Sequence, residues 1–412
     1  MSPEKHSEKH LFAAYTDEIL SFAWQDSPQS EAPPAPPASE ELEQAAERFL
    51  RLLEKSRKRH LVLLGLGSGK LVEILSQSLP AEAALTVCEL SPERARGVLE
   101  AGNAGWRTPD GPVQLLADSS PWAIVHLLAQ GNALPADALI QLNPELRPDE
   151  REVCQSLQRT LTLAKPHAAI NGTPFGHFAV QAPSLSAACV LHPDEPRLEE
   201  FFAQFPDWVE ELIVIWDADT VPQKPISAAC PVRQFARPLN GDFAAQRNRM
   251  LAECSAEWVL FLDGDERFSE DHWTLLPGLF PVRGVQAWFF PRLTFTPDAE
   301  HCRAGYGLWP DQQLRLFRNQ PGLRFENPVH ERLTGISGRT GLVLDAPILH
   351  YSHLHKKPEA LREKLALFDK ASGGKLRHRL NEEFPNLPLS RFRRANLLCN
   401  ELQVLLLPQF PA

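Results

Sequence analysis

The segment Trp258–Phe268, WVLFLDGDERF, joins an apolar strand to a cluster of acidic residues. Its first residues are apolar and prone to β-structure, and Asp263, Asp265 and Glu266 follow at once. Carboxylates that lie close together repel one another and are costly to remove from water. We therefore expect a positively charged group at this point for at least part of the working cycle.

Asp263 and Asp265 are two positions apart, and residues at that spacing in an extended chain point to the same side. Gly264 between them removes bulk, so that a ligand can approach the backbone. Two carboxylates at the carboxyl end of a strand suit Mg²⁺ or Mn²⁺. That edge is also where open α/β sheets bind ligands. A simple Asp-Gly turn with two solvated charges is the alternative interpretation.

The preceding strand, in ELIVIWDADT, ends in the same way, with Asp217 and Asp219 after an apolar run. Asp217 could accept hydrogen bonds from a nucleobase or a sugar, or it could cap the turn that follows. Asp242 is the predicted N-cap of the helix between these two strands. In that helix, Arg247 and Asn248 could bind an anionic ligand, or they could belong to a solvated face.

Composition limits the class of protein. The chain has 412 residues, of which 43% are hydrophobic and 23% charged, as in an ordinary soluble protein of two or three domains. The net charge of −10 argues against nucleic acid as a partner. Seven scattered cysteines without a C-x-x-C pair indicate a reducing compartment. Neither a signal peptide nor a membrane-spanning run is evident, so we expect a cytoplasmic protein.

Changes in composition divide the chain into four parts. A leader and a linker rich in Pro, Ala and Ser occupy 1–40. Alternating strands and helices predict a parallel, helix-covered sheet over 41–165. After a break rich in Gly and Pro, a second α/β domain is expected over 184–375, and helical periodicity predicts a C-terminal helical extension over 376–412. The expected fold class is therefore α/β, with two sheet-bearing domains.

The first α/β region carries a glycine-rich loop. Gly65, Gly67 and Gly69 follow a predicted strand and open a helix, Glu89 ends the next strand, and Asp118 ends the third. An acid about 20 residues after such a loop suits a ribose hydroxyl of a nucleotide cofactor. This arrangement resembles S-adenosylmethionine-dependent methyltransferases and the Rossmann-like N-terminal region of bacterial motility-associated glycosyltransferases. The position two residues before the first glycine, usually acidic in the methyltransferases, is leucine here.

The second α/β region contains, in this order, the segments LSAACVLH, IVIWDADT, NGDFAAQRNRMLAECSAEWVLFLDGDE, GLWPDQQLRLFRN, RFENPVHERL and ILHYSHLHKKPEALREKLALFDKASG. Together they resemble family 2 glycosyltransferases with the GT-A fold, and in particular the bacterial enzymes that add sugars to lipopolysaccharide core. The similarity covers roughly Leu185–Lys375, close to half of the chain. Two departures are HPDE, in place of an Asn-Glu pair after the first strand, and WDAD, in place of a glycine-containing turn after the second.

The resemblance implies transfer of a sugar from a nucleotide-diphosphate donor with inversion, and Mn²⁺ or Mg²⁺ as cofactor. Asp217 matches the position that contacts the base, and Asp263 and Asp265 match the D-x-D pair that touches the ribose and holds the metal. A metal neutralises the charge that develops on the leaving diphosphate. Inversion also needs a general base for the acceptor hydroxyl. Glu331 is the favoured candidate for this base, and Asp311 is the second.

Two further features belong to the same region. His350, in ILHYSHLH, could be an additional metal ligand, although a histidine at a strand end often only packs there. The stretch Gln312–Leu316, QQLRL, echoes the Q-x-x-R-W motif of processive family members. Leucine replaces tryptophan, so we expect a single addition of sugar.

The expected partners are the nucleotide sugar and an acceptor that is a surface glycan, a lipid-linked glycan or a protein. A lipid-linked acceptor would bring the protein to the inner face of the membrane as a peripheral protein. The predicted donor-binding residues are Asp217, Asp219, Arg247, Asn248 and Asp263. Two alternatives stay open, namely an S-adenosylmethionine-dependent methyltransferase built on the first region, and a non-catalytic assembly factor built from two nucleotide-binding folds.

Overall fold

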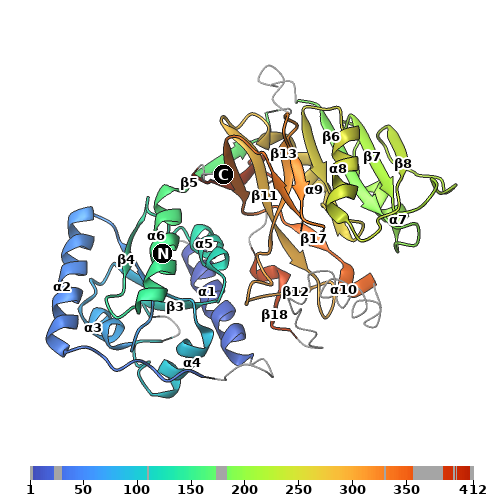
Figure 1. Cartoon of the computed structure of the whole chain (residues 1–412). Helices are drawn as coiled ribbons and strands as arrows, with labels where there is room; N and C mark the ends of the chain where they lie inside the picture. Colours follow the sequence, from blue (N-terminus) through green and yellow to red (C-terminus); the bar gives the residue numbers. More distant parts are fainter. Residues whose placement is uncertain are drawn as a thin grey trace. The chain divides into compact units, whose positions relative to one another are not determined.

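The computed structural model describes residues 3–22, 30–108, 111–172, 183–328, 331–355, 384–392, 395 and 397–408. Contacts divide the chain into two compact units, each with its own sheet (Figure 1). The first unit comprises Met1–Ala164, Arg303–Pro310 and Phe384–Phe392, and the second comprises Lys165–Cys302, Asp311–Glu383 and Arg393–Ala412. The expected α/β class is confirmed. In the described part of the chain, no helix combines the length and the apolar character needed to cross a membrane.

The first unit is a parallel sheet flanked by helices. Its sheet has the strand order β3-β2-β1-β4, and every neighbouring pair is parallel. Apolar residues of α2 at helical spacing, including Leu42, Phe49 and Leu53, pack into the core beside the buried strand β1. Its elements are α1 (Pro3–Ser21), α2 (Ser39–Ser56), β1 (His60–Leu64), α3 (Lys70–Ser78), β2 (Ala84–Glu89), α4 (Pro92–Glu100), β3 (Val113–Ala117), α5 (Pro121–Gln130), β4 (Ala138–Leu142), α6 (Pro148–Leu163), β18 (Asn386–Pro388) and η3 (Leu389–Arg391).

Helix α1 lies in the range that the sequence assigned to a leader, where no helix was predicted. It packs against β3, and the Thr16 hydroxyl donates a hydrogen bond of 2.7 Å to the Leu115 carbonyl oxygen. Tyr15 and Ile19 are fully buried. The burial of these side chains makes α1 an integral part of the first unit, since apolar area removed from water stabilises the packed helix.

The second unit is built on a large mixed sheet with the strand order β5-β19-β16-β11-β13-β9-β6-β7-β8, and β17 pairs with both β10 and β11. Helix α8 packs across β6 and β7 (Figure 1). Its elements are β5 (Lys165–Ile170), β6 (Leu185–Leu191), α7 (Leu198–Ala203), β7 (Glu211–Trp216), β8 (Val232–Ala236), α8 (Phe243–Glu253), β9 (Trp258–Phe261), β10 (Glu266–Arg267), α9 (Glu270–Leu275), η2 (Leu276–Leu279), β11 (Val285–Thr294), β12 (His301–Arg303), β13 (Gln312–Arg318), β14 (Arg324–Glu326), β15 (Arg332–Thr334), β16 (Arg339–Val343), β17 (Ile348–His350), α10 (Ser352–His355) and β19 (Glu401–Leu406).

Strands β6, β7 and β9 are buried on both faces of this sheet. Alternate residues of each strand enter two separate cores: Leu260 lies in one of them, and Val259 and Phe261 lie in the other. The three strands run parallel in the order β9-β6-β7. Their carboxyl ends therefore meet at one edge, the edge at which open α/β sheets bind ligands.

The prediction of a helical extension over 376–412 is wrong where the structure describes this range. The segment Glu401–Leu406 is the strand β19, which pairs antiparallel with both β16 and β5. A short apolar run does not by itself distinguish a buried helix from a buried strand. Here one partner strand on each side, β16 and β5, pairs with its backbone groups, and these pairings stabilise the strand conformation. The sequence also predicts a helix over 359–373, EALREKLALFDKASG, and this segment lies outside the described residues.

Candidate active site

Arginines neutralise the acidic cluster that follows β9. Arg247 donates a hydrogen bond of 3.2 Å to Oδ1 of Asp263, and Arg315 donates one of 2.8 Å to Oδ2. Both guanidinium groups lie over the ring of Phe261, at 4.6 and 4.5 Å from its centre. Burial alone would raise the pKa of Asp263, but Arg315 and Arg247 hold it well below its usual range. Arg247 and Arg315 therefore provide, at Asp263, the positive charge that we expected from the sequence.

Glu266 is the buried centre of this cluster. Its side chain is fully buried, and Arg315 binds both of its oxygens, at 2.7 and 3.0 Å. Arg292 donates a third hydrogen bond of 3.2 Å, and the backbone amide of Asp263 donates a fourth of 3.1 Å. Glu266 thus closes the turn that carries the two aspartates, and its charge is fully compensated.

The sequence prediction did not assign Arg292, Arg315 or Glu266 to the site. A signal for the two arginines was available, because each stands between apolar residues of a strand, in PRL and LRL. Arginine is rarely buried in a strand unless an acidic partner is buried with it. The sequence does not say which acid that partner is.

The two candidate general bases lie at opposite ends of the same ionic network. Glu331 Oε1 is 2.6 Å from Nε of Arg247, which also binds Asp263. Asp311 accepts a hydrogen bond of 2.8 Å from Nε of Arg292 and one of 2.7 Å from Gln313. Acidic and basic groups therefore alternate from one candidate base to the other. Glu331 is joined to the D-x-D segment through a single shared guanidinium group.

Asp265 lies beside His350, as the sequence suggested. Strands β10 and β17 pair antiparallel, and the amide of Tyr351 donates a hydrogen bond of 2.9 Å to the Asp265 carbonyl oxygen. Asp265 Oδ1 is 3.5 Å from Nε2 of His350, whose Nδ1 is hydrogen-bonded to the Thr294 hydroxyl at 2.9 Å. The hydrogen bond between Thr294 and Nδ1 orients the His350 ring so that Nε2 faces the Asp265 carboxylate. A hydrogen bond to the second ring nitrogen is common for metal-binding histidines.

The two aspartates of the D-x-D segment face different partners. The sequence predicted that Asp263 and Asp265 grip one cation together, whereas Asp263 binds two arginines and Asp265 neighbours His350. Among the described residues, no group of three or more acidic, histidine or cysteine side chains could hold a metal ion. A carboxylate and an imidazole at this separation fit two neighbouring ligands of Mn²⁺ or Mg²⁺, if phosphate and water complete the shell.

The loops after β6 and β7 border the same edge. Asp217 is half-buried, and its Oδ1 accepts a hydrogen bond of 2.7 Å from the amide of Leu239, while Asp219 is exposed. Glu195, from the HPDE segment, lies directly over Gly264, where an added Cβ would be 2.8 Å from Glu195 Cγ. Only glycine allows this close approach. Glu195 therefore borders the D-x-D segment, and the sequence prediction did not name it as a site residue, although HPDE differs from the family pattern.

Asn248 has a structural role in this conformation. Its amide nitrogen donates a hydrogen bond of 2.8 Å to the carbonyl oxygen of Phe325, and its oxygen accepts one of 2.8 Å from the amide of the same residue. The side chain therefore anchors β14 to α8. Of the two predicted residues of α8, it is Arg247 that faces the acidic cluster.

In the first unit, the chain's own carboxylates occupy the glycine-rich loop. Oε2 of Glu89 accepts a hydrogen bond of 2.8 Å from the amide of Leu66, and Glu89 is buried. Glu145 accepts one of 3.0 Å from the amide of Ser68, and a Cβ added at Gly67 would lie 2.8 Å from the carboxyl carbon of Glu145. The loop amides that would bind a cofactor anion are thus directed at internal acids.

The linker segment also packs onto this unit. The amide of Glu31 donates a hydrogen bond of 2.9 Å to the Glu93 carbonyl oxygen, and the Glu31 carboxylate pairs with Arg94 at 3.4 Å and Arg147 at 3.3 Å. A Cβ added at Gly97 would lie only 1.9 Å from the Glu31 carbonyl oxygen. This part of the predicted linker is therefore fitted closely against α4.

Asp118, the second acidic residue predicted for the cofactor site of this unit, is fully buried. The Tyr15 hydroxyl donates a hydrogen bond to its carboxylate, and the amide of Ser120 donates another of 2.7 Å. Burial raises the pKa of Asp118 to about 7, although these hydrogen bonds act in the opposite direction. Asp118 thus holds α1 in place, and its carboxylate is not exposed to a ligand.

This buried acid makes the stability of the protein depend on pH. The folded-state pKa of about 7 lies above the ordinary value of 3.8, so between these pH values the folded state retains a proton that the unfolded state has lost. The free energy of unfolding therefore falls as pH rises through this window, by up to about 1.4 kcal/mol per pH unit. We expect Asp118→Asn to remove this slope, which urea titrations of both proteins at pH 4 to 7 would measure. Parallel pH profiles would contradict the assignment.

Comparison with known proteins gives partial matches. No family model matches the chain. A TPR repeat-containing protein of Synechococcus elongatus is 32% identical over 144 residues, which are 35% of this chain and 34% of that protein. A lipopolysaccharide core biosynthesis glycosyltransferase of Rhizobium meliloti, LpsC, is 29% identical over 149 residues, which are 34% of this chain and 52% of that protein. The chain thus spans about a third and about half of the length of these curated relatives.

Two solved structures also match part of the chain. Residues 1–349 of TarS from S. aureus, in complex with UDP-GlcNAc, match 47% of this chain and 68% of that one, with a TM-score of 0.29 and 14% identity. The mannosyltransferase PcManGT from Pyrobaculum calidifontis, in complex with GDP-Man and Mn²⁺, matches 27% and 36% of the two chains, with a TM-score of 0.21 and 17% identity.

Proposed function

We propose that the second unit transfers a sugar from a nucleotide-diphosphate donor to an acceptor hydroxyl, with inversion at the anomeric carbon. The observation that carries this proposal is the meeting of Asp217, Asp263 and Asp265 at the carboxyl ends of parallel strands β7 and β9, beside buried arginines. This edge suits a ligand that has both hydroxyl donors and negative charge. The name of the partly matching relative LpsC, a glycosyltransferase, supports the same reaction class.

The donor would be held by groups from three elements. Asp217 accepts hydrogen bonds from the base, and Asp263 accepts them from the ribose, since a carboxylate has lone pairs beyond those that its arginines use. Asp265 and His350 would hold Mn²⁺ or Mg²⁺. When bound, that ion would supply positive charge beside the diphosphate. Arg247 keeps Asp263 in place and adds to the positive potential there.

The general base is proposed to be Glu331, with Asp311 as the second candidate. The base takes the proton of the acceptor hydroxyl as the hydroxyl oxygen forms its bond to the anomeric carbon. The bond from that carbon to the diphosphate breaks on the opposite face, which inverts the centre. Glu331 is favoured because the guanidinium group of Arg247 joins it to Asp263, whereas Asp311 is joined to Glu266.

The acceptor is proposed to be a surface glycan, a lipid-linked glycan or a protein, reached in the cytoplasm or at the inner face of the membrane. The first unit is proposed to be a scaffold or a docking module rather than a methyltransferase. The support for this choice is that Glu145 and Glu89 occupy the amides of its glycine-rich loop. The remaining alternative is a non-catalytic assembly factor. If no nucleotide sugar binds, this alternative replaces the transferase proposal.

A panel of ligands tests this proposal. We expect one of UDP-, GDP- or dTDP-sugars, with Mn²⁺, to raise the melting temperature, because a ligand at 100 times its Kd stabilises the folded state by about 2.7 kcal/mol. The shift should disappear in Asp265→Ala and persist in Arg249→Ala, an exposed arginine of α8. S-adenosylmethionine should produce no shift. A shift with S-adenosylmethionine alone, lost in Glu89→Ala, would instead establish the methyltransferase alternative.

A further inference from the structure

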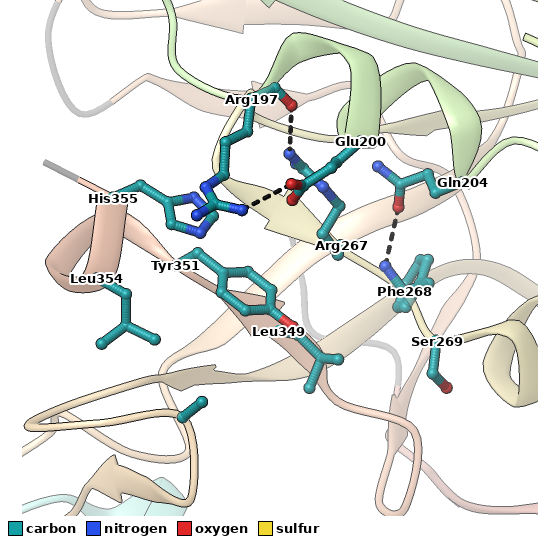
Figure 2. A pocket seen from close by; sticks show the side chains of 11 residues that line it. Arg197, Glu200, Gln204, Arg267, Phe268, Ser269, Leu349, Tyr351, Leu354 and His355 are labelled. Carbon is teal, nitrogen blue, oxygen red and sulfur yellow. Dashed lines mark hydrogen bonds and ion pairs between the residues drawn. The ribbon is translucent and has the colours of Figure 1, made fainter.

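A cavity of ≈ 610 Å³ opens in the second unit beside the candidate active site (Figure 2). Its walls come from the start and end of α7, from β10 and from the β17–α10 segment. The polar and aromatic side chains that matter most are those of Arg197, Glu200, Arg267, Phe268, Tyr351 and His355. A volume of this size accommodates one or two sugar rings, since pockets for small molecules are typically about 300–1,000 Å³.

The cavity and the candidate metal pair share the same two strands. Arg267 follows Asp265 by two positions, and Tyr351 follows His350 directly. The amide of Tyr351 donates to the carbonyl oxygen of Asp265, and Arg267 donates a hydrogen bond of 2.8 Å to that of Gly264. Two residues that line the cavity are therefore hydrogen-bonded to the backbone of the D-x-D segment.

Arg267 differs from the other buried arginines of this region. The ionic network described above pairs Arg247, Arg292 and Arg315 with carboxylates. Arg267 is only 8% exposed, yet it donates to carbonyl oxygens, those of Gly264, Glu266 and Arg197, and forms no direct ion pair with a carboxylate among the described residues. The carboxylates of Glu200, Asp265 and Glu195 act on its charge from a greater distance. An anionic group bound directly to Arg267 would compensate this buried charge better.

The lining also contains a second arginine and an aromatic face. The guanidinium group of Arg197 is 2.6 Å from Glu200, and His355 lies near enough for the charge of Arg197 to act on it (Figure 2). The rings of Tyr351 and His355 are stacked, with centres 5.1 Å apart and planes inclined by 10°. Flat aromatic faces bind the apolar C–H face of a sugar, and arginines bind phosphate or carboxylate groups.

We propose that this cavity binds an anionic sugar of the acceptor, with its phosphate or carboxylate group directed at Arg267 and Arg197. The inference rests on the proposed transferase function, because it places the acceptor beside the donor site. Sugar phosphates and uronates share the required chemistry. A phosphate group is tetrahedral and a carboxylate group is planar, so a sugar phosphate and a uronate are tested as separate probes.

Ligand-observed NMR with the full chain tests the proposal. The probes are glucose 6-phosphate, glucuronate and methyl glucoside. We expect one or both anionic sugars to bind more tightly than methyl glucoside, and Arg197→Met to weaken that binding by about 10-fold, the effect of one lost charge-assisted hydrogen bond. Arg267→Met should weaken it at least as much. Arg249→Met, which removes an exposed arginine outside the cavity, should have no effect.

The Arg197 side chain is 55% exposed, so we expect Arg197→Met to fold like the parent protein. Anionic sugars that bind no better than methyl glucoside, or that bind unchanged to Arg197→Met, would overturn the proposal. Binding of the nucleotide-sugar panel to the same samples separates the two hypotheses. If nucleotide sugars bind and anionic sugars do not, the cavity inference alone fails. If anionic sugars bind and nucleotide sugars do not, the proposed transfer reaction fails, and the acceptor role of the cavity fails with it.

Discussion

Replacing Arg315 with methionine is expected to lower the free energy of unfolding by about 3–5 kcal/mol, the usual cost of leaving a buried charge without its partner. The Arg315 side chain is 5% exposed, and it binds Glu266, which is 0% exposed, as well as Asp263. Without the guanidinium group, the carboxylate of Glu266 would keep only Arg292 and one backbone amide. Urea denaturation at pH 7 would measure the loss.

Arg318→Met is the matched control, because Arg318 lies on the same strand and pairs with Glu257 at the surface. Exposed ion pairs contribute about 0–1 kcal/mol, so this variant should remain close to the parent protein. Adding Glu266→Gln to Arg315→Met should restore part of the loss, since neighbouring charges are not independent. If Arg315→Met lost no more stability than Arg318→Met, the buried network would not hold the turn together.

Replacing Asp265 with asparagine is expected to reduce transfer of the sugar by about 100-fold or more, the scale seen when one group that stabilises developing charge is removed. Asparagine preserves the shape of the side chain and removes its charge, and a neutral amide is a weaker ligand for Mg²⁺ or Mn²⁺. Release of the nucleoside diphosphate, measured over a titration of Mn²⁺, would show both the lost rate and a higher requirement for the ion.

Two comparisons show whether this effect is specific. Asp271→Asn removes an exposed carboxylate at the start of α9, and it should leave activity and the Mn²⁺ requirement unchanged. Asp263→Asn should lower both activity and stability, because it leaves Arg247 and Arg315 without one of their carboxylates. An Asp265→Asn protein with a rate within a few-fold of the parent and the same Mn²⁺ dependence would remove Asp265 from the proposed mechanism.

Local patterns in the sequence predicted many individual elements. Apolar runs identified β6, β7 and β9, because a strand covered on both faces needs apolar residues at nearly every position. Asp242 was predicted as the N-cap of α8, and its Oδ1 accepts a hydrogen bond of 2.8 Å from the amide of Ala245. Interactions of this kind join neighbours along the chain, so the sequence contains nearly all of the information that they need.

Pairings between distant segments were not predictable in the same way. From the sequence we predicted that the three acids after β9 lie near a positive charge. We did not predict that Arg292 and Arg315 provide that charge. Likewise, the apolar segment of β19 has no local feature that selects a strand, and its two neighbours in the sheet decide its conformation. Strand pairing depends on which backbone groups lie alongside, and that depends on the whole topology.

By itself, the sequence determined that this protein is an α/β chain which carries acidic residues to the carboxyl ends of buried strands, because burial and strand geometry follow from residue order. Only the tertiary structure decided that Asp263 faces arginines while Asp265 faces His350, and that Glu145 fills the glycine-rich loop. A carboxylate interacts with whichever charge or amide lies within a few ångströms. That neighbour comes from a remote strand or loop, which folding alone brings into contact.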